Sequence, residues 1–127
     1  FVDDIRGAYA AGDVFCFPTH EENEGIALLE AMAAEKPVVV RDIETFSWLE
    51  DGEDCLKVGD ERAAEAESDV AAGDARGDNV EGFVDAIDEL RGADRRAELG
   101  ARAAERSEAF SLDAIAERYR SLYAELA

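Results

Sequence analysis

Two glutamates, Glu22 and Glu30, stand eight positions apart on either side of a glycine, Gly25. Carboxylates accept hydrogen bonds from hydroxyl groups, including those of sugars. The glycine lies where a polar loop, residues 19–24, meets a segment of helical composition, and it allows the backbone to approach a ligand closely. Backbone amides at the start of a helix bind phosphate groups. The combination predicts a site for a nucleotide sugar.

Two short apolar runs flank this segment and, with a third segment further along the chain, predict the strands that must position it. Continuous apolar runs of this length are typical of strands buried on both faces of a parallel sheet. The runs are Val14–Phe17, which Pro18 ends, and Pro37–Val40, and Cys55–Val58 is expected to form a third, shorter strand. Helical segments alternate with them, so we expect an α/β fold: a Rossmann-like parallel sheet with flanking helices and right-handed crossovers. Ligands of such sheets bind at the carboxyl ends of the strands.

Composition and capping residues predict the helices. We expect a first helix to open at Asp3 and Asp4 and to end before Gly12, a second over residues 26–34, and one helical turn over 45–49. Further helices are expected after Asn79, over 94–109 and after Ser111. The first and last of these three carry apolar stripes, at 80, 83, 84, 87 and 90 and at 112, 115, 119, 122, 123 and 126.

Residues 59–78 differ in character from the rest of the chain. Glu, Ala, Asp and Gly dominate there, and Val70 is the exception among residues that are otherwise small or polar. Such a composition cannot bury a core of its own. We therefore expect a mobile acidic surface insertion within a single domain spanning residues 1–127.

The charge balance argues against nucleic acid as a partner and suggests concentrated salt as the environment. There are 32 acidic and 13 basic residues, for a formal net charge of −19. So negative a field repels nucleic-acid phosphates, and no basic patch offsets it. Acidic residues spread over helix surfaces, with only two lysines, fit a halophilic protein, because concentrated salt screens their repulsion. A merely acidic mesophilic protein is the alternative.

The two cysteines, Cys16 and Cys55, lie in apolar strand-like surroundings. We expect both to be buried apolar groups rather than ligands or nucleophiles. No dense cysteine framework and no signal peptide are present, so a reduced cytoplasmic protein is the default. No stretch matches a calcium-binding loop, and no run approaches transmembrane length.

Several motifs resemble a known family. The run Phe15–Pro18, the run Glu21–Ala33 (EENEGIALLEAMA) and the strand Lys36–Val40 resemble the C-terminal domain of retaining GT-B glycosyltransferases of family 4. The segments 41–43 and 48–52 look closest to members that glucosylate diacylglycerol. The closing helices from Ser111, with their Leu122-Tyr123 ending, are also similar.

The resemblance implies a role for each residue of the site. Glu30 would accept hydrogen bonds from the ribose hydroxyls, and Glu22 would contact the donor sugar as the catalytic-site glutamate, with Asn23 in the same loop. The amides near Gly25, Ile26 and Ala27 would hold the diphosphate. The family works without a metal or other cofactor, so the acidic loop need not bind magnesium.

Two neighbouring residues have open interpretations. His20, the sole histidine, could approach the sugar, although a loop histidine without function is the simpler reading. Arg41 follows a strand and could reach a ligand or pair with Asp42.

The chain begins at Phe1 and enters a helix almost at once. We expect a truncated C-terminal half of a glycosyltransferase that cannot catalyse transfer alone. The acceptor, a lipid or glycan, would then bind through a missing N-terminal domain, and the parent could be peripheral at a membrane. The strand Val14–Phe17 would have a bare edge, through which the fragment is expected to self-associate.

Three other functions compete with donor binding. A sugar-nucleotide 2-epimerase would place carboxylates and histidines differently, and a single histidine supports it poorly. A sugar phosphorylase needs a lysine for pyridoxal phosphate, and neither Lys36 nor Lys57 is suitably placed. A non-catalytic α/β interaction module would have Glu22 and Glu30 as plain surface residues and no affinity for nucleotides.

Overall fold

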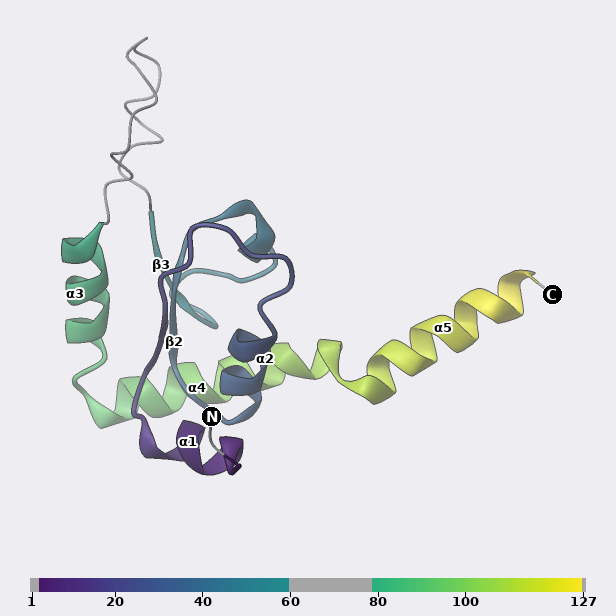
Figure 1. Ribbon diagram of the computed structural model, residues 1–127, viewed down its shortest axis with the longest axis horizontal. Helices are drawn as coiled ribbons and strands as arrows, with labels where there is room; N and C mark the ends of the chain where they lie inside the picture. The colour runs from purple at the N-terminus through teal and green to yellow at the C-terminus, as the bar shows by residue number, and fades with distance from the viewer. Residues whose placement is uncertain (1–2, 60–78, 127) are drawn as a thin grey trace, which may run out of the picture.

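The computed structural model describes residues 3–59 and 79–126, and it contains a three-stranded parallel sheet (Figure 1). The strands are β1 (Phe15–Phe17), β2 (Val38–Arg41) and β3 (Leu56–Val58), in the order β1-β2-β3. Phe15 pairs with Val38, and Val39 pairs with Leu56. The predicted α/β fold with a parallel sheet is therefore confirmed, and all three carboxyl ends lie at the same edge.

The helices cover both faces of this sheet. Figure 1 shows α2 on one side, α3 on the other, α4 across one end, and α5 reaching away from the body. Their bounds are α1 Ile5–Ala11, α2 Ile26–Ala33, α3 Val80–Glu89, α4 Ala93–Ser107 and α5 Leu112–Leu126, with single 3₁₀ turns η1 at Glu44–Phe46 and η2 at Glu108–Phe110. The predicted caps Asp4, Asn79 and Ser111 each accept a hydrogen bond from an amide in the first turn.

The central strand, β2, divides the core into two clusters because its side chains alternate between the faces. Val38 and Val40 pack with Leu28, Met32 and Phe46 on the α2 side. On the other side, Val39 packs against residues of α3 and its C-cap, of α4 and of β3, namely Phe83, Leu90, Leu99, Leu56 and Val58. The prediction that this strand is buried on both faces is confirmed.

For β1, the prediction that the strand is buried on both faces was wrong. Phe15 and Phe17 are half-buried, and Cys16 between them is exposed. The reason is its position: β1 is an edge strand, and α3 packs against β2 and β3 rather than over β1. Cys16 is therefore not a buried apolar group, whereas Cys55 is.

This difference predicts selective labelling of the two thiols. Burial, with the charge of Asp54, raises the pKa of Cys55 to about 12, so its thiol stays protonated at neutral pH. Reaction requires an accessible thiolate. We expect a disulfide reagent to modify one thiol in the native protein and both after denaturation, and Cys16→Ser to abolish native labelling. Native labelling that persists in Cys16→Ser would contradict this burial pattern.

Two amphipathic stripes pack less than expected. Phe83 of α3 and Leu90, directly after the helix, are buried, but Val80, Val84 and Ile87 are exposed. In α5, the large apolar side chains are all exposed, from 36% for Ile115 to 86% for Leu112, because the helix leaves the body (Figure 1). The predicted insertion lies, except for Gly59, outside the described residues.

A tight turn joins α2 to β2, and α4 packs against this turn. The amide of Lys36 donates to Ala31 O at 3.1 Å and that of Glu35 donates to Met32 O at 2.9 Å, the pattern of a Schellman motif. Glu35 adopts the left-handed conformation, with φ 56°, that glycine usually fills. Gly100 of α4 lies directly against this turn: a Cβ there would stand 2.2 Å from Glu35 O.

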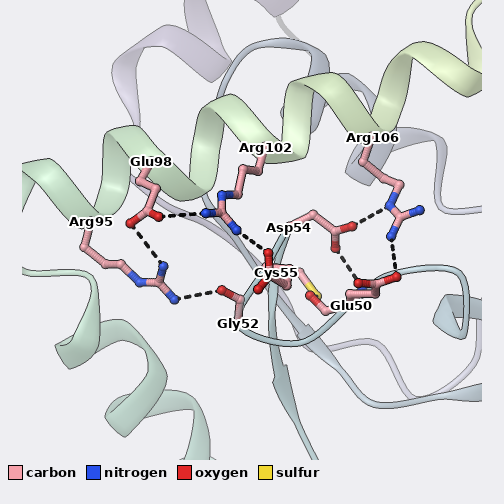
Figure 2. Close-up of polar contacts among 9 residues, drawn as sticks. Glu50, Gly52, Asp54, Cys55, Arg95, Glu98, Arg102 and Arg106 are labelled. Carbon is pink, nitrogen blue, oxygen red and sulfur yellow. Dashed lines mark hydrogen bonds and ion pairs between the residues drawn. The ribbon is translucent and has the colours of Figure 1, made fainter.

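Ion pairs and hydrogen bonds connect α4 with the loop before β3, at the edge of the sheet where the strands begin. Figure 2 shows Arg95 reaching Gly52 O, and Arg106 reaching Glu50 and Asp54. Asp54 is only 4% exposed and also accepts from the Glu50 amide at 2.9 Å. This network is structural, since it lies at the opposite end of the strands from the loop that carries Glu22.

The Asp54–Arg106 pair predicts a clear effect on stability. Asp54→Asn removes the negative charge but keeps the shape, leaving the arginine without its buried partner. We expect the free energy of unfolding to fall by about 1–3 kcal/mol. Glu53→Gln is the matched control, because Glu53 contacts Arg102 at an exposed site, and we expect a change within about 0.5 kcal/mol. Urea titrations in which both variants lose equal stability would contradict this assignment.

None of the helices in the described ranges is long and apolar enough to cross a bilayer. Across residues 3–59 and 79–126, no group of three or more His, Cys, Asp or Glu side chains could hold a metal ion.

Candidate functional site

Gly25 occupies the junction between the loop after β1 and α2. Its φ of 72° and ψ of 47° are left-handed, and a Cβ would lie 3.0 Å from the ring of Phe46. Both facts favour glycine. The amides of Leu28 and Leu29 donate to Gly25 O at 2.9 and 3.1 Å. The two preceding amides, of Ile26 and Ala27, have no acceptor within the helix and point out of its N-terminus.

Two side chains hold the loop that leads to this junction, one from the end of β2 and one from η1. Thr45 Oγ1 donates to Glu22 O at 2.9 Å, and Arg41 Nε donates to Pro18 O at 3.3 Å. Thr19 Oγ1 donates to Glu21 O at 2.7 Å within the loop. Glu22 itself is half-buried, and its Oε1 accepts from the Asn23 amide at 2.8 Å. The structure thus places Glu22, Asn23 and Gly25 in one loop at the carboxyl edge.

Glu30 lies on the exposed surface of α2 and has a partner that the sequence analysis missed. Tyr9 of α1 donates its hydroxyl to Glu30 Oε2 at 2.8 Å and lies 3.2 Å from Ala27 O. Burial first, and then the hydrogen bond and charge of Glu30, raise the pKa of Tyr9. The hydroxyl therefore keeps its proton at neutral pH and acts as a donor to the carboxylate.

A row of aromatic rings connects Tyr9 with the glycine junction. Ring centroids lie 5.8 Å apart between Tyr9 and Phe15, 5.7 Å between Phe15 and Phe17, and 6.0 Å between Phe17 and Phe46. Such spacings suit favourable tilted aromatic pairs. The row packs against the core cluster beneath α2, and Phe46 at its end contacts the position of Gly25. The N-terminus of α2 at Gly25 and the side chain of Glu30, through Tyr9, therefore both contact this row of aromatic rings.

Arg41 is buried beneath the carboxyl edge, with 2% of its surface exposed. Its guanidinium carbon lies 5.3 Å from the centre of the Phe83 ring, a cation–π geometry. The carboxylate of Asp42 contacts Lys57 Nζ at 3.3 Å. The sequence suggested that Arg41 reaches a ligand or pairs with Asp42. The structure adds a third role, because Arg41 contacts both Pro18 after β1 and Phe83 of α3.

Sequence reasoning missed Tyr9, Thr45 and Phe46. The alternation of Phe15 and Phe17 could have predicted an aromatic face on β1. Their ring partners, Tyr9 and Phe46, come from elements distant in the sequence. Only the packing of α1 and η1 against that face brings them to the site.

Residues 1–72, more than half of the chain, match the family described as "Glycosyl transferases group 1". The chain belongs to this family. The matched residues include the loop, Gly25, α2 and all three strands, so the candidate site lies within the part of the chain that defines the family.

Two known proteins are similar to parts of this domain. A processive diacylglycerol alpha-glucosyltransferase from Acholeplasma laidlawii is 46% identical over 54 residues, which are 42% of this chain and 16% of that protein. A sucrose-phosphate synthase from Thermosynechococcus elongatus shares the fold, with a TM-score of 0.71 and 24% identity, over 94% of this chain and 26% of that one. The chain thus spans a minor part of either relative's length.

Proposed function

We propose that this domain binds the nucleotide-sugar donor of a retaining GT-B glycosyltransferase of family 4, as its C-terminal half. The observation that carries the proposal is the junction at Gly25, where a left-handed glycine opens α2 without a side-chain cap. The same helix presents Glu30 one turn further on. Family membership makes a donor site the expected use of this geometry.

Each residue has a separate task in this proposal. The amides of Ile26 and Ala27 bind the diphosphate and stabilise the negative charge that develops on the leaving nucleoside diphosphate. Glu30 accepts the ribose hydroxyls. Glu22 contacts hydroxyls of the donor sugar, and Asn23 lies beside it. The reaction proceeds without a metal or other cofactor. The bond between the anomeric carbon and the phosphate oxygen breaks while the acceptor oxygen bonds to that carbon from the same face, and the proton of the acceptor hydroxyl passes to the departing phosphate.

The proposed donor and acceptor are inferred from the diacylglycerol glucosyltransferase that is similar to part of this chain. A diacylglycerol glucosyltransferase transfers glucose to a lipid, so UDP-glucose and a lipid, or else a glycan, are the substrates proposed here, with the protein at the membrane surface. A sugar-nucleotide 2-epimerase and a non-catalytic module are the alternatives. The acidic composition supports a cytoplasm of concentrated salt as the working environment.

The test is calorimetric titration of the protein in molar potassium chloride with UDP, UDP-glucose and GDP-mannose. The proposal predicts binding that prefers one base. Binding of no nucleotide at millimolar concentration would overturn it, and a preference for GDP-mannose would reject the proposed donor while leaving the site in place.

A further inference from the structure

We propose that Tyr9 is a positioning residue of the donor site: its hydroxyl orients the Glu30 carboxylate for the ribose hydroxyls. This inference rests on the proposed function. Tyr9 contacts no proposed ligand group itself and would act only through Glu30.

The hydrogen bond is well suited to fixing a carboxylate. Tyr9 Oη lies 2.8 Å from Glu30 Oε2 and 3.2 Å from Ala27 O, and a phenol has a single proton. The shorter contact, to an ionised group, is the stronger one. A carboxylate has about four lone-pair sites, so one donor on Oε2 leaves sites for two ribose hydroxyls.

The carboxylate needs such a partner because it is otherwise exposed. Glu30 lies on the solvent side of α2, where a long side chain samples several rotamers. Ordering those rotamers on binding lowers affinity. A tyrosine that holds the carboxylate beforehand removes part of that loss.

Tyr9 is itself held in place, which a positioning residue requires. Its ring packs on Phe15, and the aromatic row through Phe17 ends at Phe46 below Gly25. The phosphate-binding junction and the ribose-binding carboxylate therefore share one rigid support. A simple tether between α1 and α2 would also use this bond, so the test must separate the two roles.

The experiment compares nucleotides with and without ribose hydroxyls. Tyr9→Phe keeps the ring and removes only the hydroxyl. We expect its affinity for UDP to fall about 3- to 10-fold, the range of one hydrogen bond, with affinity for 2′,3′-dideoxy-UDP unchanged. In a Glu30→Gln background, Tyr9→Phe should have no further effect on UDP. Tyr119→Phe, on the exposed face of α5, is the control and should bind as the wild type does.

Each outcome decides between the roles. Equal losses for UDP and the dideoxy nucleotide, or a loss that persists in the Glu30→Gln background, would make Tyr9 a structural tether and overturn the inference. If Glu30→Gln weakens UDP binding while Tyr9→Phe does not, the proposed function stands and only the inference fails. A wild-type protein that binds neither UDP nor GDP overturns both.

Discussion

Replacing Glu30 by glutamine is expected to weaken nucleotide binding about 10- to 100-fold, since hydrogen bonds to an ionised group contribute about 1.5–3 kcal/mol. The amide keeps one oxygen acceptor but loses the charge and two of the lone-pair sites that ribose hydroxyls would use. The fold should be unaffected because Glu30 is exposed on α2. Calorimetric titration with UDP, beside thermal unfolding, measures both quantities.

The control for this prediction must carry the same change in charge. The protein has a formal net charge of −19, so removal of any carboxylate reduces its repulsion of a nucleotide. Glu105→Gln removes one charge from α4, at the other end of the sheet, and should leave the affinity nearly unchanged. If Glu30→Gln binds UDP as well as this control does, Glu30 is a plain surface carboxylate.

Replacing Gly100 by alanine is expected to reduce the free energy of unfolding by about 2–3 kcal/mol, within the range for overpacked cores. The added Cβ would lie 2.2 Å from Glu35 O and 3.0 Å from Glu35 C, which are backbone atoms of a tight turn and cannot rotate away. Alanine favours a helix over glycine by about 1 kcal/mol, so the clash must exceed that gain. Urea unfolding monitored by circular dichroism measures the change.

Gly92→Ala makes the same substitution at the start of the same helix. Nothing lies within 4 Å of a Cβ at Gly92, and its φ of −72° suits alanine. Gly92 is the N-cap residue of α4, where glycine is preferred over alanine, so we expect a loss of no more than about 1 kcal/mol. Similar losses in the two variants would show that α4 does not press on the turn at Glu35.

The close approach at Gly100 also bears on the site. The turn at Glu35 ends α2 and starts β2, so α4 supports the far end of the helix that carries Glu30. A variant that moves α4 would therefore be expected to shift α2 as well. We therefore expect core packing and the geometry of the proposed donor site to be coupled through α2.

Local patterns in the sequence determined the elements. An apolar run identified β2, because a strand in the middle of a parallel sheet has no polar face. β3 is an edge strand, and its apolar residues Leu56 and Val58 are buried because α3 packs against it. Asp4 and Asn79 marked helix starts, since their side chains satisfy amides in the first turn. The spacing of Glu22, Gly25 and Glu30 predicted a loop and helix start, which the structure has at those residues. Their roles in binding stay predictions.

Only the tertiary structure decided which side chains are exposed and which distant residues contact each other. Cys16 and Val39 stand in similar apolar runs, yet one is exposed and the other buried, because strand order makes β1 an edge. The sequence by itself determined which residues form the loop, the helix and the strands, since capping and periodicity act over a few residues. Only the fold brought Tyr9 to Glu30, 21 positions away, because contacts across such distances depend on how whole elements pack.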